Sequence, residues 1–357
     1  MHLKNLFLFY FLFVFGVALG QTPELSPLSR ISVLTSGPGE ELYSSFGHSA
    51  FRVQDQALGV DVVYNYGVFD PGTENFYLKF AQGRMFYSLA RHSFQGYLNS
   101  YKIDNRWVKE QVLNLTLDQR NDLFSYLETN NLPENQSYQY DYFLNNCATK
   151  IWDILKENYG EELVFDPSYI DDHYSFRELI HHYINPNSWG AFGIDVALGS
   201  DIDRKATAKE HMYLPDYIFK QLQAAKLNGQ PLAQKATTLF EGNSNQNNAS
   251  FFASPLFLFS LISMIIIVIT FFDFKKKTRS QGFDFGLFFL SGLAGLVLFL
   301  LWFLTDHLWT VNNFNLVWAI PFNLIIAFLL LRKSPPKWIS TYMLFVLILL
   351  DVAVLLW

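Results

Sequence analysis

The sequence predicts an α+β domain on the outer side of a membrane, followed by a transmembrane domain of four helices. Three observations lead to this fold class. Long apolar runs occupy residues 4–19 and 251–357, while the roughly 230 residues between them have the composition of a globular domain large enough for its own core. That central stretch contains strand-like segments and a capped helical segment. The loops between the C-terminal apolar runs also differ sharply in positive charge.

The N-terminus has the pattern of a secretory signal peptide. Lys4 precedes an apolar core, and the small residues Ala18 and Gly20 come before a polar stretch. We therefore expect residues 1–20 to be a signal that is removed. An uncleaved anchor helix is the alternative, and with either one the domain at 21–242 is exported.

Four apolar segments in the C-terminal third approach the ~20 residues that cross a bilayer as a helix. They lie at about 252–272, 285–304, 314–331 and 338–357. The loops at 275–279 and 332–337 are basic, whereas the loop at 305–315 has no Lys or Arg. The positive-inside rule therefore places the two basic loops in the cytoplasm, and the third loop outside with the exported domain. A polar linker at 243–250 joins that domain to the membrane domain at 251–357.

The charge balance and the missing motifs exclude several classes of partner. The chain has 26 Lys and Arg against 32 Asp and Glu, a net charge of −6, whereas nucleic-acid binders are basic. The sequence has no metal-binding HExxH or CxxC spacing, no glycine-rich phosphate loop and no GxSxG elbow. We expect no nucleic acid, no metal and no cofactor, and we expect the apolar segments alone to attach the chain to a membrane.

Cys147 is the single cysteine of the 357 residues. Exported cysteines ordinarily pair, and a lone cysteine has no intramolecular partner. Three interpretations remain, namely a buried inert thiol, an intermolecular disulfide and a nucleophile. Taken alone, the cysteine count favours the buried thiol.

The residues that follow Cys147 favour the nucleophile. The stretch NNCATKIWDILKENYG predicts a helix, with Asn145 or Asn146 as its N-cap and Gly160 as its stop. Cys147 and Ile151 share the face that packs inward. The free N–H groups and the dipole at a helix start stabilise a thiolate, so Cys147 stands where thiol enzymes activate sulfur.

Among the eight histidines, His48 has the strongest pattern around it. SSFGHSAFRV at 44–53 predicts a strand on which His48, Ala50 and Arg52 share one face, and DVVYNYGVF at 61–69 predicts a second strand beside it. A strand histidine satisfied by hydrogen bonds is the simpler interpretation. A histidine within reach of the thiol would instead act as its base.

Together the two motifs resemble a known arrangement. A histidine in FGHSAFRV followed by a cysteine in NNC resembles the circularly permuted papain-like fold of NlpC-type peptidases and lecithin:retinol acyltransferase relatives. Most of the chain is similar to the Lnb family, the lipoprotein N-acyltransferases of Gram-negative bacteria. The similarity rests on FGHSAFRV, VVYNYGVFDPGTENFYLKFAQG (62–83), YDYFLNNCATKIWD (140–153) and TDHLWTVNNFNLVWAIPFN (305–323). This resemblance implies that Cys147 is the nucleophile and His48 its base.

The resemblance also implies an activity and a location. The enzyme would lie in a bacterial inner membrane, with its catalytic domain on the periplasmic side. Cys147 would take an acyl chain from a phospholipid as a thioester, and the N-terminal amine of a lipid-modified lipoprotein would then accept the chain as an amide. A membrane-tethered NlpC-type cell-wall peptidase is the alternative, although its short linker limits its reach. A scaffold in which Cys147 only packs is the third hypothesis.

A third polar residue is expected to orient the His48 ring. We expect Asn65, because its strand should lie beside the first one while Tyr64 and Tyr66 point to the other face. If that other face is the inward one, Tyr64 takes this place, and Tyr64 is also counted as a substrate-binding candidate. The backbone N–H of Cys147 is the expected oxyanion donor.

The loop TDHLWTVNNFN at 305–315 is expected to form the floor of the site, since it shares a side of the membrane with the exported domain. Asp306 and His307 would bind the lipid head group or the acceptor amine. Asn315 and Asn323 would shape the mouth between helices, because polar groups within a membrane are costly without a partner. An interfacial turn anchored by tryptophans is the alternative.

Two further features are ambiguous. Arg52 and Arg84 could each meet a lipid phosphate or form ordinary surface ion pairs. The segment NFYLKFAQGRMFYSLA at 75–90 is rich in aromatic residues. It could line an acyl groove, but a core segment is the favoured interpretation.

Overall fold

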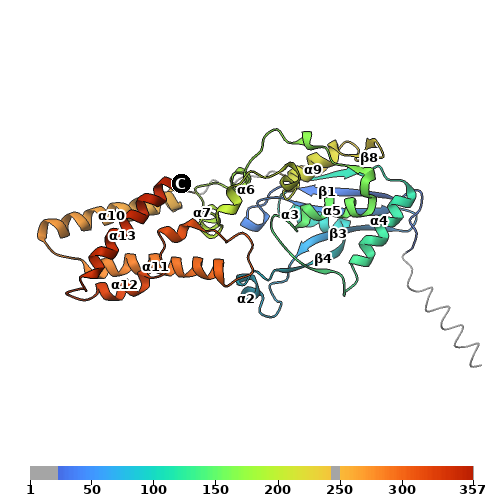
Figure 1. Cartoon of the computed structure of the whole chain (residues 1–357). Helices are drawn as coiled ribbons and strands as arrows, with labels where there is room; N and C mark the ends of the chain where they lie inside the picture. Colours follow the sequence, from blue (N-terminus) through green and yellow to red (C-terminus); the bar gives the residue numbers. More distant parts are fainter. Residues whose placement is uncertain (1–22, 243–249, 357) are drawn as a thin grey trace, which may run out of the picture.

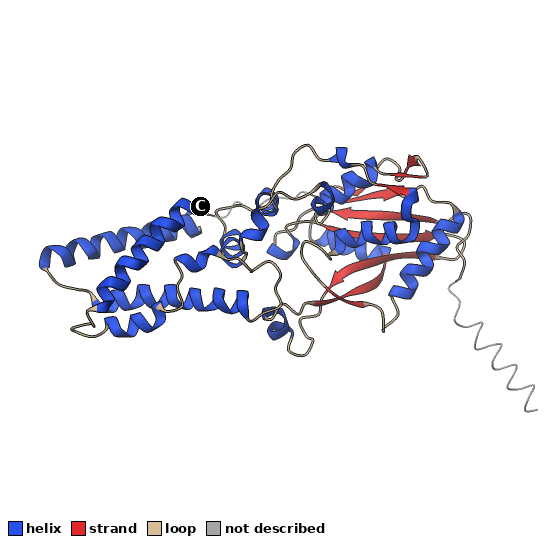
Figure 2. Ribbon diagram, viewed as in Figure 1, coloured by secondary structure: helices blue, strands red, loops and turns tan. Residues whose placement is uncertain are grey.

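The computed structural model describes residues 23–242 and 250–356, which form two bodies joined end to end (Figure 1). A domain built around a sheet occupies one end, and long helices extend away from it (Figure 2). The signal peptide expected at 1–20 lies outside the described residues, as does most of the linker expected at 243–250. The predicted class, an α+β domain followed by an apolar helical domain, is confirmed.

A seven-stranded antiparallel sheet forms the centre of the first domain, in the order β10-β5-β1-β2-β3-β4-β6. Its strands are β1 (Arg30–Ser36), β2 (His48–Asp55), β3 (Val60–Val68), β4 (Phe86–Ser93), β5 (Val108–Val112), β6 (Ser137–Gln139) and β10 (Thr237–Phe240). A second, three-stranded sheet contains β7 (Leu163–Val164), β8 (Lys226–Leu227) and β9 (Gln230–Pro231). The predicted strand at 44–53 begins only at His48, because Leu42–Ser44 form the 3-10 turn η1. The pairing of β2 with β3 sets the two predicted strands side by side in the middle of the sheet.

Helices lie on both faces of this sheet. The helices of this domain are α2 (Phe76–Ala81), α3 (Phe94–Ile103), α4 (Leu117–Asn130), α5 (Cys147–Tyr159), α6 (Phe176–Tyr183), α7 (Trp189–Ala197), α8 (Ala208–His211) and α9 (Pro215–Ala224), and not all of them touch the sheet. The short 3-10 turns η2 (Gly160–Glu162), η3 (Pro167–Tyr169) and η4 (Ser200–Asp203) connect them. Helices α4 and α5 pack in the main core with Phe51 and Tyr64 of the sheet, whereas α3 packs on the opposite face with Ala50 and Val63. Alternate residues of β2 and β3 therefore serve two different cores, as the period of a strand requires.

Helix α5 follows the sequence prediction closely. Asn146 is its N-cap, with a side chain that accepts the backbone N–H groups of Ala148 and Thr149, and Gly160 is its C-cap. Ile151 and Leu155 on the inward face are fully buried. Truncating either to alanine would cost about 2–5 kcal/mol, so the position of the helix start is fixed by core packing.

Three apolar helices of the second domain are long enough to cross a membrane, among the residues that the structure describes. They are α10 (Pro255–Lys276), which follows the 3-10 turn η5 (Phe251–Ala253), α11 (Gln281–Phe303) and α13 (Trp338–Leu356). Their surfaces are mostly exposed apolar side chains, as expected for helices that face lipid. Arg279 donates to the backbone carbonyls of Leu330 and Arg332, so the two basic loops lie at the same end of the domain.

The fourth span expected at 314–331 is wrong as a continuous helix. The segment consists of the 3-10 turn η6 (Phe314–Val317), a turn through Pro321, and the eight-residue helix α12 (Asn323–Leu330). Eight residues rise only about 12 Å, too little to cross a bilayer. Proline breaks the helix because it lacks an N–H, and the freed backbone is tolerated where it is packed against protein. This part of the chain runs antiparallel to α11. Before the segment, Thr310 donates a hydrogen bond to the carbonyl of Leu301, and near its end Phe328 contacts Phe285.

The loop at 305–315 joins the two bodies. The carbonyls of Trp309 and Asn312 accept the backbone N–H groups of Gly199 and Ser200, just after α7. The indole of Trp309 packs against Phe143 and Phe176 of the soluble core, with ring centroids 4.8 Å and 5.5 Å apart. The soluble domain is therefore seated on the membrane domain by a packed joint, in addition to the chain connection.

Candidate active site at the start of helix α5

Cys147 is the first residue of α5 and remains partly exposed. The side chain of Asn146 satisfies the next two N–H groups, and its own amide donates to the carbonyls of Tyr142 and Tyr213. This double anchoring fixes the helix start from both sides. The partial exposure of the thiol argues against the interpretation of Cys147 as a buried inert residue.

The imidazole of His48 lies close enough to the Cys147 side chain for each group to shift the pKa of the other. His48 is the first residue of β2, and the backbone N–H of the next residue, Ser49, helps to lower the pKa of Cys147. One strand start therefore supplies both a base and a fixed donor to the thiol. Sequence reasoning predicted the pair, but it missed the donor.

Asn65 is the third side chain of the site, after Cys147 and His48. Its Oδ1 lies 2.5 Å from Nε2 of His48, and β3 carries it beside β2. Because the amide oxygen accepts, Nε2 carries the proton and Nδ1 is left to face the sulfur. Tyr64, the alternative to Asn65, points to the other face, where it is fully buried and its hydroxyl donates to Glu128. The structure thus places Asn65, and not Tyr64, against the imidazole.

The environment favours an ion pair between the two groups. Burial opposes charge on the imidazole, but the neighbouring Cys147 charge, with the hydrogen bond that the ring donates to Asn65, raises the pKa of His48 to about 10. Burial likewise opposes a thiolate, and the charge and hydrogen bond of His48, with the N–H groups of Ser49 and Ala148, lower the pKa of Cys147. Both shifts favour the pair of thiolate and imidazolium, which is the reactive state of a thiol nucleophile.

Gly67 keeps space open beside the sulfur. Its φ of 89° is in the left-handed region, and the pairing of β3 with β4 shifts register here. A Cβ at this position would lie 3.6 Å from Cβ of Cys147 and 3.8 Å from the Tyr140 ring. Glycine is therefore favoured by the backbone conformation, and a side chain here would contact Cys147.

Two predicted substrate-binding residues have structural roles instead. Arg52 is buried, pairs with Asp61 and Glu110 at 2.8 Å and 2.9 Å, and lies over the ring of Phe94. A guanidinium paired with two carboxylates has no free side for a lipid phosphate. Tyr64 is withdrawn into the core, as described above.

Asn315 and Asn323 do not form a mouth between helices. Asn315, with Asn313, donates to the last carbonyls of α7, including that of Val196, which a helix end leaves unpaired. Asn323 is buried in the membrane domain, where it donates to Ser291 and accepts from Tyr342. Both side chains have the partners that polar groups need at these depths, and both hold helices together.

Asp306 and His307 lie where the loop at 305–315 contacts residues 80–84 of the first domain. Asp306 forms an exposed ion pair with Arg84 at 2.8 Å, and its N–H donates to the carbonyl of Gln82. The ring of His307 lies 6.5 Å from that of Phe80. The segment that leads into Cys147 rests on the same loop, because Asp141 accepts from the Trp309 indole.

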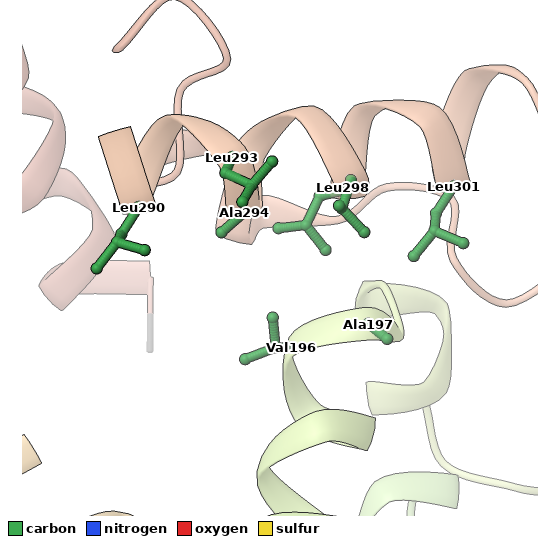
Figure 3. Close-up of a pocket in the computed structure, with 8 residues that line it drawn as sticks. Val196, Ala197, Leu290, Leu293, Ala294, Leu298 and Leu301 are labelled. Atoms are coloured by element: carbon green, nitrogen blue, oxygen red, sulfur yellow. The ribbon is translucent and has the colours of Figure 1, made fainter. Parts of the chain in front are cut away.

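An apolar cavity of about 360 Å³ lies at another part of the joint (Figure 3). It separates the end of α7, with Val196 and Ala197, from the side of α11, and leucines such as Leu293 and Leu301 point into it. The cavity has no titratable lining residue. Its lining is suited to a hydrocarbon chain and offers no side chain that could take part in catalysis.

The tyrosines around Cys147 had only a weak signal in the sequence. Tyr138, Tyr140 and Tyr142 gather around Cys147, and burial raises the pKa of each hydroxyl. Their alternating spacing in SYQYDYF was visible, but a run of tyrosines is equally typical of an ordinary core strand. The contact of Trp309 with the core of the first domain was not predicted, since the tryptophans of this loop were considered only as interfacial anchors, in the alternative interpretation.

Comparison with known proteins identifies the family of the chain. The family model described as the Lnb N-terminal periplasmic domain matches residues 24–179, and the one described as the Lnb transmembrane domain matches residues 246–357. No curated protein and no solved structure matches the chain. A periplasmic domain joined to a transmembrane domain fits an inner-membrane protein, and the family indicates an enzyme of lipoprotein maturation. The chain belongs to the Lnb-type lipoprotein N-acyltransferase family.

Proposed function

We propose that the chain is a cysteine-dependent acyltransferase that moves an acyl chain from a phospholipid to the N-terminal amine of a lipoprotein through a Cys147 thioester. The observation that carries the proposal is the line Cys147, His48 and Asn65 at a partly exposed helix start. The two family matches support a membrane enzyme of lipoprotein maturation. The catalytic groups are Cys147 and His48, with Asn65 as the residue that positions the ring.

In the first half-reaction the thiolate attacks the ester carbonyl of a phospholipid. The carbonyl oxygen becomes an oxyanion, for which the backbone N–H of Cys147 at the helix start is the expected donor. When the ester C–O bond breaks, the imidazolium of His48 gives its proton to the leaving alcohol. The products are a thioester on Cys147, a neutral imidazole and a lysophospholipid.

In the second half-reaction the α-amine of a lipid-modified N-terminal cysteine attacks the thioester. Neutral His48 accepts the proton that the amine loses, and the C–S bond breaks. The products are an N-acyl amide and the original thiolate–imidazolium pair. Asn65 keeps Nε2 protonated throughout, so that Nδ1 is the nitrogen that exchanges protons with both substrates.

The joint supports a membrane substrate over a cell-wall substrate. A wall peptidase of NlpC type would use the same pair, but it would need to reach away from the bilayer. Here Trp309 contacts Phe143 and Asp141, within six residues of Cys147, and so ties the site to the membrane loop. A domain seated in this way acts on substrates that lie at the membrane surface.

Intact-mass analysis of the purified full chain with phospholipid vesicles tests the proposal. The protein is expected to gain the mass of one acyl group, and neutral hydroxylamine should remove it, because thioesters are cleaved more readily than oxygen esters. Cys147→Ala is the matched control and should gain nothing. An adduct of equal amount on Cys147→Ala, or no adduct on the natural chain, would contradict the thioester.

A further inference from the structure

Helix α2 exposes an apolar surface beside the active site. None of its six residues is buried, and Tyr77, Leu78 and Phe80 are 75%, 58% and 48% exposed. The interpretation of 75–90 as a core segment is therefore wrong for this helix. Large exposed apolar patches mark interaction surfaces, because water gives them no favourable contacts. We therefore expect the exposed surface of α2 to bind an apolar partner.

Stacked rings connect this surface to the sulfur. The ring of Tyr140, next to Cys147, lies 4.2 Å from that of Tyr87, and Tyr87 lies 5.2 Å from Phe69. Phe69 in turn stacks on Phe76 of α2 at 5.8 Å. We call these four rings and α2 the aromatic track. It forms a continuous series of ring contacts from the neighbourhood of Cys147 to α2.

The 3-10 turn η1 lines the other side of the track. Tyr43 of this turn is 75% exposed, and its ring meets that of Phe69 edge-on at 6.2 Å. The turn ends four residues before His48. The same short segment therefore supplies both an apolar wall and, a few residues later, the base.

The outer end of the track touches the membrane domain. A Cβ at Gly83 would collide with the backbone of His307, so α2 is held closely against the loop that follows α11. The hydrogen bond from the Asp306 N–H to Gln82 and the Arg84–Asp306 ion pair fix the same contact. Figure 1 shows α2 between the two bodies, beside the end of α11. The helix thus lies at the level where α11 leaves the apolar layer.

Aromatic side chains at this level are typical of elements that sit in the interface of a bilayer. Lys79 is exposed among them and can reach a lipid phosphate while its stem stays on apolar surface. A phospholipid of the outer leaflet is the apolar partner that such a surface meets first. A water-soluble partner would not need a surface continuous with the membrane helices.

We propose that α2 is seated in the outer leaflet and that the aromatic track guides the acyl chain of a phospholipid from the bilayer to Cys147. The inference rests on the proposed acyl transfer and adds the route and the lipid-binding surface. The acyl chain lies along the track with its ester beside Gly67, so the glycerol and head group joined to that ester lie near the thiol, and the methyl end of the chain lies toward α2. The α7–α11 cavity is then not the binding site of the reacting chain.

Photolabelling locates the chain directly. Full-length Cys147→Ala in vesicles that contain a phospholipid with a photoreactive diazirine in one acyl chain cannot react through the thiol, so labelling reports binding alone. We expect labelled peptides from 69–90, in addition to general labelling of the membrane helices. Labelling at Val196 and the facing side of α11 with none in 69–90 would overturn the route.

A kinetic comparison tests the function of the track. The double variant Tyr77→Gln/Leu78→Gln should form the thioester from vesicle phospholipid roughly tenfold more slowly, because two apolar contacts with the chain are lost. Its alkylation by water-soluble iodoacetamide should match that of the natural chain, which shows that the fold and thiol are intact. Leu58→Gln is the matched control, since Leu58 is 44% exposed in the turn at the far end of β2 from His48.

The outcomes separate the two proposals. If Tyr77→Gln/Leu78→Gln forms the thioester as fast as Leu58→Gln, the track is not the route, although the thioester mechanism stands. If neither the natural chain nor the control forms any thioester, the acyl-transfer proposal itself fails. Slow alkylation of the double variant would also count against the track, since the loss would then come from a damaged site.

Discussion

The two sides of the domain boundary use polar residues in opposite ways. On the soluble side, Cys147, His48 and Asn65 lie next to one another, and Cys147 is partly exposed. Their side chains still have groups that could contact a substrate. On the membrane side, Asn315 and Asn323 have partners for their side chains and are buried. A polar residue near a membrane therefore does not by itself indicate a catalytic role. In the proposed mechanism, polar residues whose groups are not fully paired act on substrate, whereas those with satisfied partners hold helices together.

Replacing His48 should have the largest effect on the chemical side of this comparison. In His48→Gln the thiolate loses its cation, while burial still raises the pKa of Cys147, so that pKa should rise to its ordinary value of about 8.5 or above. Alkylation by iodoacetamide at pH 7 should then fall by at least roughly 30-fold and recover as the pH is raised. The measurement is the alkylation rate against pH. An unchanged acid limb would show that His48 does not activate the sulfur.

Removing Asn65 should have a smaller effect through the ring that it positions. Asn65→Ala takes away the acceptor of the Nε2 proton, and the loss of a hydrogen bond to a charged group corresponds to about 10- to 100-fold in thioester formation. Because that bond favours the imidazolium, the alkaline limb of the rate profile should move to lower pH.

Asn65→Asp is the conservative control. It keeps an acceptor at the same place and should restore part of the rate, with the alkaline limb at higher pH than in Asn65→Ala. Equal loss in both variants, with no movement of either limb, would mean that Asn65 acts only on folding.

On the membrane side of the boundary, replacing Trp309 is the most direct test of the contact between the two domains. Trp309→Ala should lower thioester formation from vesicles by about tenfold and destabilise the chain by about 1–3 kcal/mol, because a partly buried ring leaves the joint. Alkylation of Cys147 by iodoacetamide should stay unchanged. Trp309→Phe keeps a ring but loses the bond to Asp141, and it should lie between the two. If Trp309→Ala slows alkylation as much as acylation, the joint would belong to the catalytic machinery.

The smallest effect is expected at Asp306. Its ion pair with Arg84 is about 60% exposed on both sides, and exposed pairs contribute only about 0–1 kcal/mol. Asp306→Asn should therefore change the temperature of unfolding by no more than a few degrees. Its effect on acyl transfer decides whether the residue also contacts substrate. A loss of tenfold or more, without loss of stability, would return Asp306 to the site, as the sequence predicted.

Local chemistry explains which predictions succeeded. The cap Asn146, the stop Gly160 and the pairing of the two strands depend on a few neighbouring residues, so the helix start and its strand partner could be predicted. Asn65 followed from strand alternation alone. The family resemblance then gave the roles that spacing cannot assign.

The failures share a different cause. Pro321 is a local signal for a break, but the tolerance of that break and the burial of Asn323 depend on packing against α11, which an apolar run does not reveal. Arg52 looked available because its partners Asp61 and Glu110 come from other strands. The exposure of α2 could not be predicted either, because aromatic residues that serve a core and those that serve a lipid have the same composition.

A single-turnover chase tests the central claim most directly. Acylated enzyme is freed of phospholipid and given a short peptide with an S-diacylglyceryl cysteine at its N-terminus. The enzyme should return to its unmodified mass as the peptide gains one acyl group in an amide that resists hydroxylamine. The same peptide with its α-amine acetylated should gain none. Release of the chain only as free fatty acid, at the same rate with both peptides, would contradict acyl transfer and leave Cys147 as the nucleophile of a hydrolase.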